Sequence, residues 1–109
     1  MTEMLMVFTA FANADDAARV VRTLVEERLI ACGNLLPGVR SLYRWEGKVA
    51  DQSEVMVLMK TRKQDWTALI SRLHELHPYR TPECIAVRIA AGAPAYMAWL
   101  EAALEPEQT

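Results

Sequence analysis

Residues 29–61, LIACGNLLPGVRSLYRWEGKVADQSEVMVLMKT, decide the fold because they hold two long apolar runs joined by turn-forming residues. The first run begins as Leu29–Leu36 and resumes as Val39–Trp45. Gly and Asp within Glu46–Gln52 predict a hairpin turn. Ser53–Thr61 then alternates and is rich in Val, Leu and Met, which predicts an antiparallel return strand.

Pro37-Gly38 interrupts the first run and is typical of a break or a bulge in a strand. Leu35, Val39 and Tyr43 nevertheless keep one parity, and alternate residues of a strand share a face. We therefore predict one long, bent strand through this point.

Helices are predicted on both sides of the hairpin. Asn13 can cap an amphipathic helix over Ala14–Arg28, and Asp65 can cap a second over Trp66–Leu76. The remaining predicted elements are a strand at Met4–Phe11, a strand at Cys84–Ile89, and a last helix at Ala95–Leu104 with Trp99 and Leu100 facing inward.

The resulting order is β-α-β-β-α-β followed by a helix, within one domain over residues 1–109. This order is typical of the α+β ferredoxin-like sandwich, in which one antiparallel sheet carries both helices on one face. Strands two and four are then expected at opposite edges of the sheet. Apolar residues occur at both parities of the strands, so we expect the free face to be buried against copies of the same chain.

Composition and charge exclude several classes of protein. The chain is 52% hydrophobic and 24% charged, which is typical of a soluble globular domain. A net charge of −2 and the absence of a basic stripe argue against nucleic acid as a partner. No apolar run approaches the roughly 20 residues of a membrane span. Ala12-Asn13-Ala14 is similar to a signal-peptidase site, but no Lys or Arg precedes it, so we expect a cytoplasmic protein.

Two stretches, Ser41–Lys48 and His77–Glu83, combine aromatic rings, charges and turn formers. We predict a ligand cleft formed by their side chains and a lysine of the return strand: Tyr43, Trp45, Glu46, Lys60, Tyr79 and Glu83. The alternative for the aromatic residues is a subunit interface, where such rings are enriched. The charged residues of this set and the nearby Glu54 could instead form cross-strand ion pairs.

His77 and Cys32 are the candidate metal ligands. The alternative for His77 is a polar residue that ends a helix and bonds to a backbone carbonyl. His74 lies one helical turn earlier among polar neighbours, so we expect it to face solvent. No serine lies in a nucleophile-elbow setting and no phosphate-binding loop is present, so we predict that the protein is not an enzyme.

Four motifs occur in an order that resembles the CutA divalent-cation-tolerance family over about the whole chain. They are the Ala-Cys-x-Asn-x-x-Pro-Gly turn from Ala31 to Gly38, Tyr-x-Trp-Glu-Gly-Lys from Tyr43 to Lys48, Lys60-Thr61, and His-Pro-Tyr-x-x-Pro-Glu from His77 to Glu83. The resemblance implies a compact homotrimer that is similar to PII signalling proteins, associated with tolerance of copper and other divalent metals.

The resemblance also implies where copper would bind. The ligands proposed for copper-binding members are a cysteine in the first strand and a His-His pair before Pro-Tyr. Here those positions hold Thr9, Leu76 and His77, so only weak binding of Cu(II) or another divalent cation is expected. Cys32 could add a thiolate across a subunit boundary. The competing hypotheses are a PII-like sensor of a small anionic metabolite and a stable structural trimer with incidental metal binding.

Overall fold

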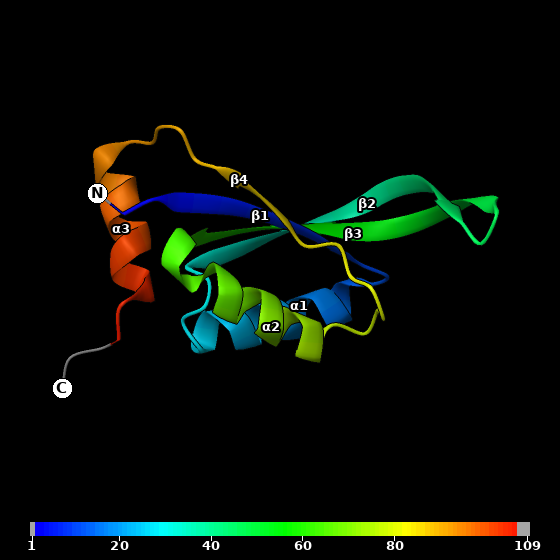
Figure 1. Cartoon of the computed structure of the whole chain (residues 1–109), viewed down its shortest axis with the longest axis horizontal. Helices are drawn as coiled ribbons and strands as arrows, with labels where there is room; N and C mark the ends of the chain where they lie inside the picture. The colour runs from blue at the N-terminus through cyan, green and yellow to red at the C-terminus, as the bar shows by residue number, and fades with distance from the viewer. Residues whose placement is uncertain (1, 107–109) are drawn as a thin grey trace.

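The hairpin predicted from residues 29–61 dominates the architecture of the computed structural model, which describes residues 2–106 (Figure 1). Strands β2 and β3 run far beyond the rest of the sheet. The elements in chain order are β1 (Met4–Phe11), α1 (Ala14–Glu26), β2 (Cys32–Trp45), β3 (Lys48–Arg62), a short 3₁₀ turn (Lys63–Asp65), α2 (Trp66–Leu76), β4 (Ile85–Arg88) and α3 (Pro94–Leu104).

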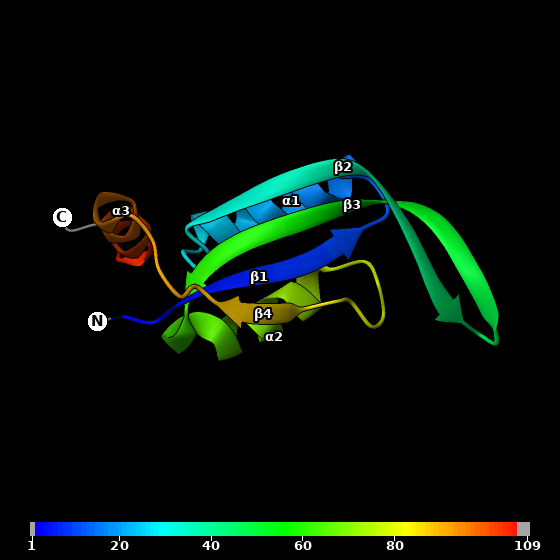
Figure 2. The same ribbon diagram turned by 90° about the horizontal axis from the view of Figure 1, so that it is seen from above.

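All strand pairs are antiparallel and the sheet order is β2-β3-β1-β4. Helices α1 and α2 cover one face of the sheet, while α3 lies at the end of the sheet near the start of the chain (Figures 1 and 2). The predicted element order is confirmed, and β2 and β4 lie at opposite edges as expected. Among the described helices, none is long and apolar enough to cross a membrane.

The core lies between α1, α2 and the helix-facing side of the sheet. Alternate residues of the two central strands point into it, as a two-residue period requires. The buried side chains of this core include Val7, Phe11, Val57 and Met59 from the strands and Val20, Leu24, Leu69 and Leu73 from the helices. Each buries enough apolar surface to contribute about 1.5–3 kcal/mol.

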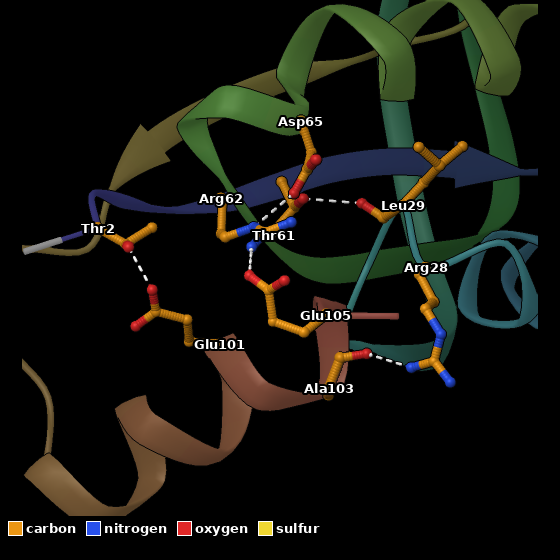
Figure 3. Close-up of polar contacts among 9 residues, drawn as sticks. All are labelled: Thr2, Arg28, Leu29, Thr61, Arg62, Asp65, Glu101, Ala103 and Glu105. Atoms are coloured by element: carbon orange, nitrogen blue, oxygen red, sulfur yellow. Dashed lines mark hydrogen bonds and ion pairs between the residues drawn. The ribbon is translucent and has the colours of Figure 1, made fainter. Parts of the chain in front are cut away.

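A second, smaller core fixes α3. Leu100 and Leu104 pack on Met4 and Ala31. Polar contacts surround this cluster, and Figure 3 shows the guanidinium of Arg62 reaching from β3 toward the end of α3. The prediction for Leu100 is therefore confirmed, but Trp99 points away from the core and is 52% exposed.

Arg62 is the centre of those polar contacts (Figure 3). Its side chain is only 8% exposed and pairs with both Asp65 and Glu105. Asp65 therefore accepts a bond from Arg62 at 2.8 Å and makes no capping bond to α2, which corrects the predicted cap. A buried guanidinium without carboxylate partners would be costly, so this pairing takes precedence over the cap.

The hairpin turn is tighter than the sequence indicated. Strand β3 begins at Lys48, so the turn consists of Glu46 and Gly47 and not of the whole segment 46–52. Both residues have positive φ, 49° and 77°. Two consecutive left-handed residues are typical of the turn whose twist matches that of the flanking strands.

Strand β2 is single and bent, as predicted, but the parity argument for it was wrong. Leu36 lies opposite Met56 while Val39 lies opposite Glu54, so β2 contains one residue more than β3 over this interval. This is a β-bulge, and it moves every later residue of β2 to the other face. Leu35 accordingly packs on the helix-side core, whereas Val39 and Tyr43 lie on the free face.

Large apolar side chains fill the free face of the sheet. Directly paired residues share a face, and Phe8 lies opposite both Leu58 and Ile85. The neighbouring pairs on this face are Met6 with Val87 and Leu36 with Met56. Ile85 is 58% exposed and Val87 is 48% exposed. Neither α1 nor α2 covers this face (Figure 2).

We expect the bulge to depend on Gly38, whose φ is 74°. Gly38→Val should lower the free energy of unfolding by about 1–3 kcal/mol, because a β-branched residue is strained in the left-handed region. Gly38→Asn is the matched control and should cost less, since Asn tolerates this conformation. Urea unfolding measures both, and equal costs would contradict the proposed backbone requirement.

Candidate binding groove

A groove of about 850 Å³ runs between the outer β2–β3 hairpin and the segment that joins α2 to β4. Four of the predicted cleft residues line it: Tyr43, Trp45, Tyr79 and Glu83. Two of these come from the hairpin and two from the connecting segment. The two motifs that the sequence singled out therefore form opposite walls of one groove.

The bulge in β2 explains why the hairpin presents its aromatic residues to this groove. Tyr43 lies opposite Ala50 and Trp45 opposite Lys48, which places them on the face that carries Glu54. Without the extra residue, the other parity of β2, with Arg44, would occupy that face. Tyr43 and Trp45 are 41% and 59% exposed, so both rings remain available for contact.

Tyr79 and Glu54 form the polar centre of the groove. The Tyr79 hydroxyl donates to Glu54 Oε2 at 2.8 Å. Burial and the bonded carboxylate raise the pKa of Tyr79 well above its usual value, so the phenol remains protonated and keeps donating. The pair fixes one carboxylate oxygen of Glu54 and leaves the other able to accept from a ligand.

Charged residues that the sequence did not single out also line the groove. Arg40 donates to both carboxylate oxygens of Asp51, with a 2.9 Å bond from Nε, and Arg80 lies on the opposite wall. Arg40 and Asp51 are not direct partners in the strand register but diagonal neighbours on one face. The two-residue turn at Glu46-Gly47 sets the register that brings them together, so the pair follows from the paired strands and not from a local motif.

Lys60 and Glu46, which the sequence placed in the cleft, do not line this groove. Lys60 lies far along β3, where its ammonium donates to the Tyr96 hydroxyl at 3.0 Å. That hydrogen bond raises the pKa of Lys60. Glu46 forms the exposed tip of the hairpin. The charged cluster predicted from the sequence is therefore divided among three places, and only Glu54 and Glu83 share the groove.

His77 ends α2 and is buried, with 6% of its surface exposed. One ring nitrogen, Nδ1, accepts from the backbone N–H of Tyr79 at 3.0 Å, and the other, Nε2, lies 2.8 Å from the carbonyl oxygen of Ala10. Since Nδ1 accepts, Nε2 must carry the proton that it donates to Ala10. The alternative of a helix-ending residue bonded to a backbone carbonyl is confirmed.

Cys32 and His77 lie at different ends of the sheet. Cys32 pairs with Lys60, which pairs with Met6 of β1, whereas His77 contacts Ala10 of the same strand. Met6 and Ala10 are four residues apart along β1, which corresponds to about 13 Å. The structure does not bring these two predicted ligands together within this chain.

The donor side chains of the described residues do not form a closed metal site. Among residues 2–106, no three His, Cys, Asp or Glu side chains gather to hold an ion. His74 is exposed, as expected. Thr9, at the position of the copper-binding cysteine in the resemblance, is fully buried, and its hydroxyl has no hydrogen-bond partner within the described part of the chain.

Comparisons with known proteins agree with one another. The family model "CutA1 divalent ion tolerance protein" matches residues 5–103. The chain is 47% identical to the divalent-cation tolerance protein CutA of Pectobacterium atrosepticum over 92 residues, covering 83% of this chain and 84% of that protein. It is 42% identical to the protein of the same name from Pyrococcus horikoshii over 97 residues, covering 89% and 94%.

Solved structures give the same result. The crystal structure of CutA from Xylella fastidiosa superimposes with a TM-score of 0.90 at 40% identity, covering 94% of this chain and 98% of that one. The CutA1 structure from Ehrlichia chaffeensis reaches a TM-score of 0.92 at 24% identity, which concerns the fold alone. None of these names describes a catalysed reaction.

The buried ring of His77 predicts a dependence of stability on pH. Burial lowers the pKa of His77 from its usual 6.5, so below pH 6.5 the unfolded chain binds a proton that the folded chain does not. The free energy of unfolding should therefore fall as the pH drops below 6.5 and level off below the folded pKa. Urea titrations should lose this component in His77→Gln and keep it in His74→Gln, and an equal loss in both variants would contradict the assignment.

Proposed function

Because the chain belongs to the CutA1 divalent ion tolerance family, we propose that it acts in divalent-cation tolerance as a non-enzymatic, cytoplasmic homotrimer. We propose further that it binds Cu(II) or another divalent cation weakly, near its subunit interfaces. The observation that carries the proposal is the uncovered apolar face of the sheet, combined with the lack of a closed metal site among the described residues of one protomer.

The apolar face supports self-association. Phe8, Leu58 and Ile85 form one row across three strands, and Met6 with Val87 forms the next. Contiguous apolar surface of this kind is rare on monomeric proteins and typical of interfaces. The hairpin tip adds Trp45, which is 59% exposed. Copies of this chain offer matching apolar surfaces, and closed symmetry would bury all of them at once.

The arrangement of donors supports weak cation binding at a boundary between protomers. Carboxylates of Glu54 and Glu83 line the groove, but no third donor joins them within the described protomer. Divalent cations such as Cu(II) need several donors in a defined geometry for tight binding. A neighbouring subunit can supply donors that one chain lacks, and a site completed in this way would be exchangeable.

The groove itself favours a second candidate function, that of a PII-like sensor of a small anionic metabolite. The Tyr79–Glu54 bond holds its walls together, and the Arg80 side chain on its wall is exposed. Guanidinium groups are well suited to carboxylate and phosphate ligands. The aromatic rings of Tyr43 and Trp45 would contact the apolar part of such a ligand.

Association through the free face predicts a clear effect of charge at Ile85. Wild type should elute as a trimer in size-exclusion chromatography with light scattering, and Ile85→Asp should shift the population to monomer, because a carboxylate would be buried without a partner. Ile70→Asp is the matched control: it changes an exposed isoleucine on α2 and should remain trimeric. A monomeric wild type, or equal behaviour of the two variants, would contradict the proposal.

Cation binding at a boundary predicts that affinity depends on assembly. Calorimetric titration with Cu(II) in a weakly chelating buffer should give saturable binding to wild type and to Ile70→Asp, reduced at least tenfold in monomeric Ile85→Asp. Undiminished binding by the monomer would place the site within one protomer. If the trimer forms but no Cu(II) binds, the copper part fails, and a thermal-shift screen of small carboxylates and phosphates would test the sensor alternative.

A further inference from the structure

His77 joins three parts of the groove region through one ring. It belongs to the end of α2, donates to the Ala10 carbonyl of β1, and accepts from the backbone of Tyr79 in the connecting segment. We infer that His77 is a positioning residue: its neutral ring, protonated at Nε2, holds the segment 78–83 so that Tyr79 reaches Glu54, and it does not serve as a cation ligand in this chain.

The hydrogen bond from the Tyr79 N–H to Nδ1 of His77 sets the direction in which segment 78–83 leaves α2. It closes a local ring between residues 77 and 79, as the side chains of Asn and Asp do in tight turns. The segment then leaves α2 in a fixed direction, and the Tyr79 side chain extends to Glu54 on β3, 2.8 Å from hydroxyl to carboxylate. One ring nitrogen thus fixes where the wall of the groove begins.

The second nitrogen and the ring faces fix the imidazole itself. Nε2 is anchored on β1 at Ala10, and the ring stacks on Phe11 with centroids 4.2 Å apart and planes 14° from parallel. The Tyr79 ring approaches at 4.8 Å with a tilt of 51°. A side chain held at both nitrogens and in contact with two aromatic rings cannot rotate without losing several contacts.

These contacts leave His77 without a donor for a metal. Coordination requires a free lone pair on a ring nitrogen, but the Nδ1 lone pair accepts from Tyr79 and Nε2 carries the donated proton. Burial is the largest influence on the pKa of His77 and lowers it, which favours the neutral ring. The bond to Ala10 and the carboxylates of Asp16 and Glu54 oppose this, and Arg19 adds to it. Binding a cation would therefore break a bond that shapes the groove.

The positioning role of His77 matters for function only if the groove binds a ligand, as proposed above, but it can be tested without a ligand. Long-range ¹H–¹⁵N correlation NMR on the wild-type protein should show His77 as the Nε2–H tautomer, with a hydrogen-bonded, unprotonated Nδ1. Saturating Zn(II) should leave both nitrogen shifts of His77 unchanged. The other tautomer, or a large Zn(II)-induced shift at His77, would overturn the inference. His74, one turn earlier and exposed, is the internal control.

A mutant cycle separates positioning from general stability. Asn at position 77 can place its oxygen where Nδ1 accepts from Tyr79, whereas Gln can reach Ala10 but leaves that N–H without its acceptor. Tyr79→Phe should lower the urea midpoint in wild type and in His77→Asn, and cause no further loss in His77→Gln. An equal loss in all three backgrounds would overturn the inference. If a position-77 variant does not fold, the NMR result on wild type decides alone.

Discussion

The bulge at Pro37-Gly38 is the constraint on which the candidate site depends. A strand can present only alternate residues to one face, so a strand that serves two environments must change parity between them. The inner half of β2 places Leu35 against the helices. The outer half must place Tyr43 and Trp45 on the opposite face, and one extra residue in the left-handed conformation of Gly38 makes this possible.

The sequence was sufficient for the element order because each element carries its own period. A short apolar run in β1, alternation in β3, a three-to-four spacing in α1 and α2, and capping at Asn13 are all local signals. The predictions failed for side chains whose orientation is decided by tertiary contacts. Asp65 had the chemistry of a helix cap, but the buried Arg62 required its carboxylate. Trp99 was expected inside on hydrophobicity, yet Leu100 and Leu104 already fill the small core beneath α3.

The candidate site was predictable to the extent that its residues lie in compact motifs. Tyr43, Trp45, Tyr79 and Glu83 come from two short stretches of unusual composition, and the structure places all four on one groove. Lys60 was assigned by its charge and by the Lys60-Thr61 motif, and in this chain the register places it opposite Cys32, away from the other four. The Arg40–Asp51 pair and the Tyr79–Glu54 bond join residues that are distant in the sequence, so they exist only once the hairpin has paired and the segment after α2 has folded back onto it.

Family membership and the residues of this chain give different information about cations. Membership concerns tolerance of divalent ions, whereas this chain offers a neutral imidazole with both nitrogens engaged and a thiol four residues away along the strands. The two agree if the functional unit is larger than one chain. If copies of the chain associate as proposed, one contact would cover the apolar free face and bring further donors to the groove, so a single assembly would account for both features.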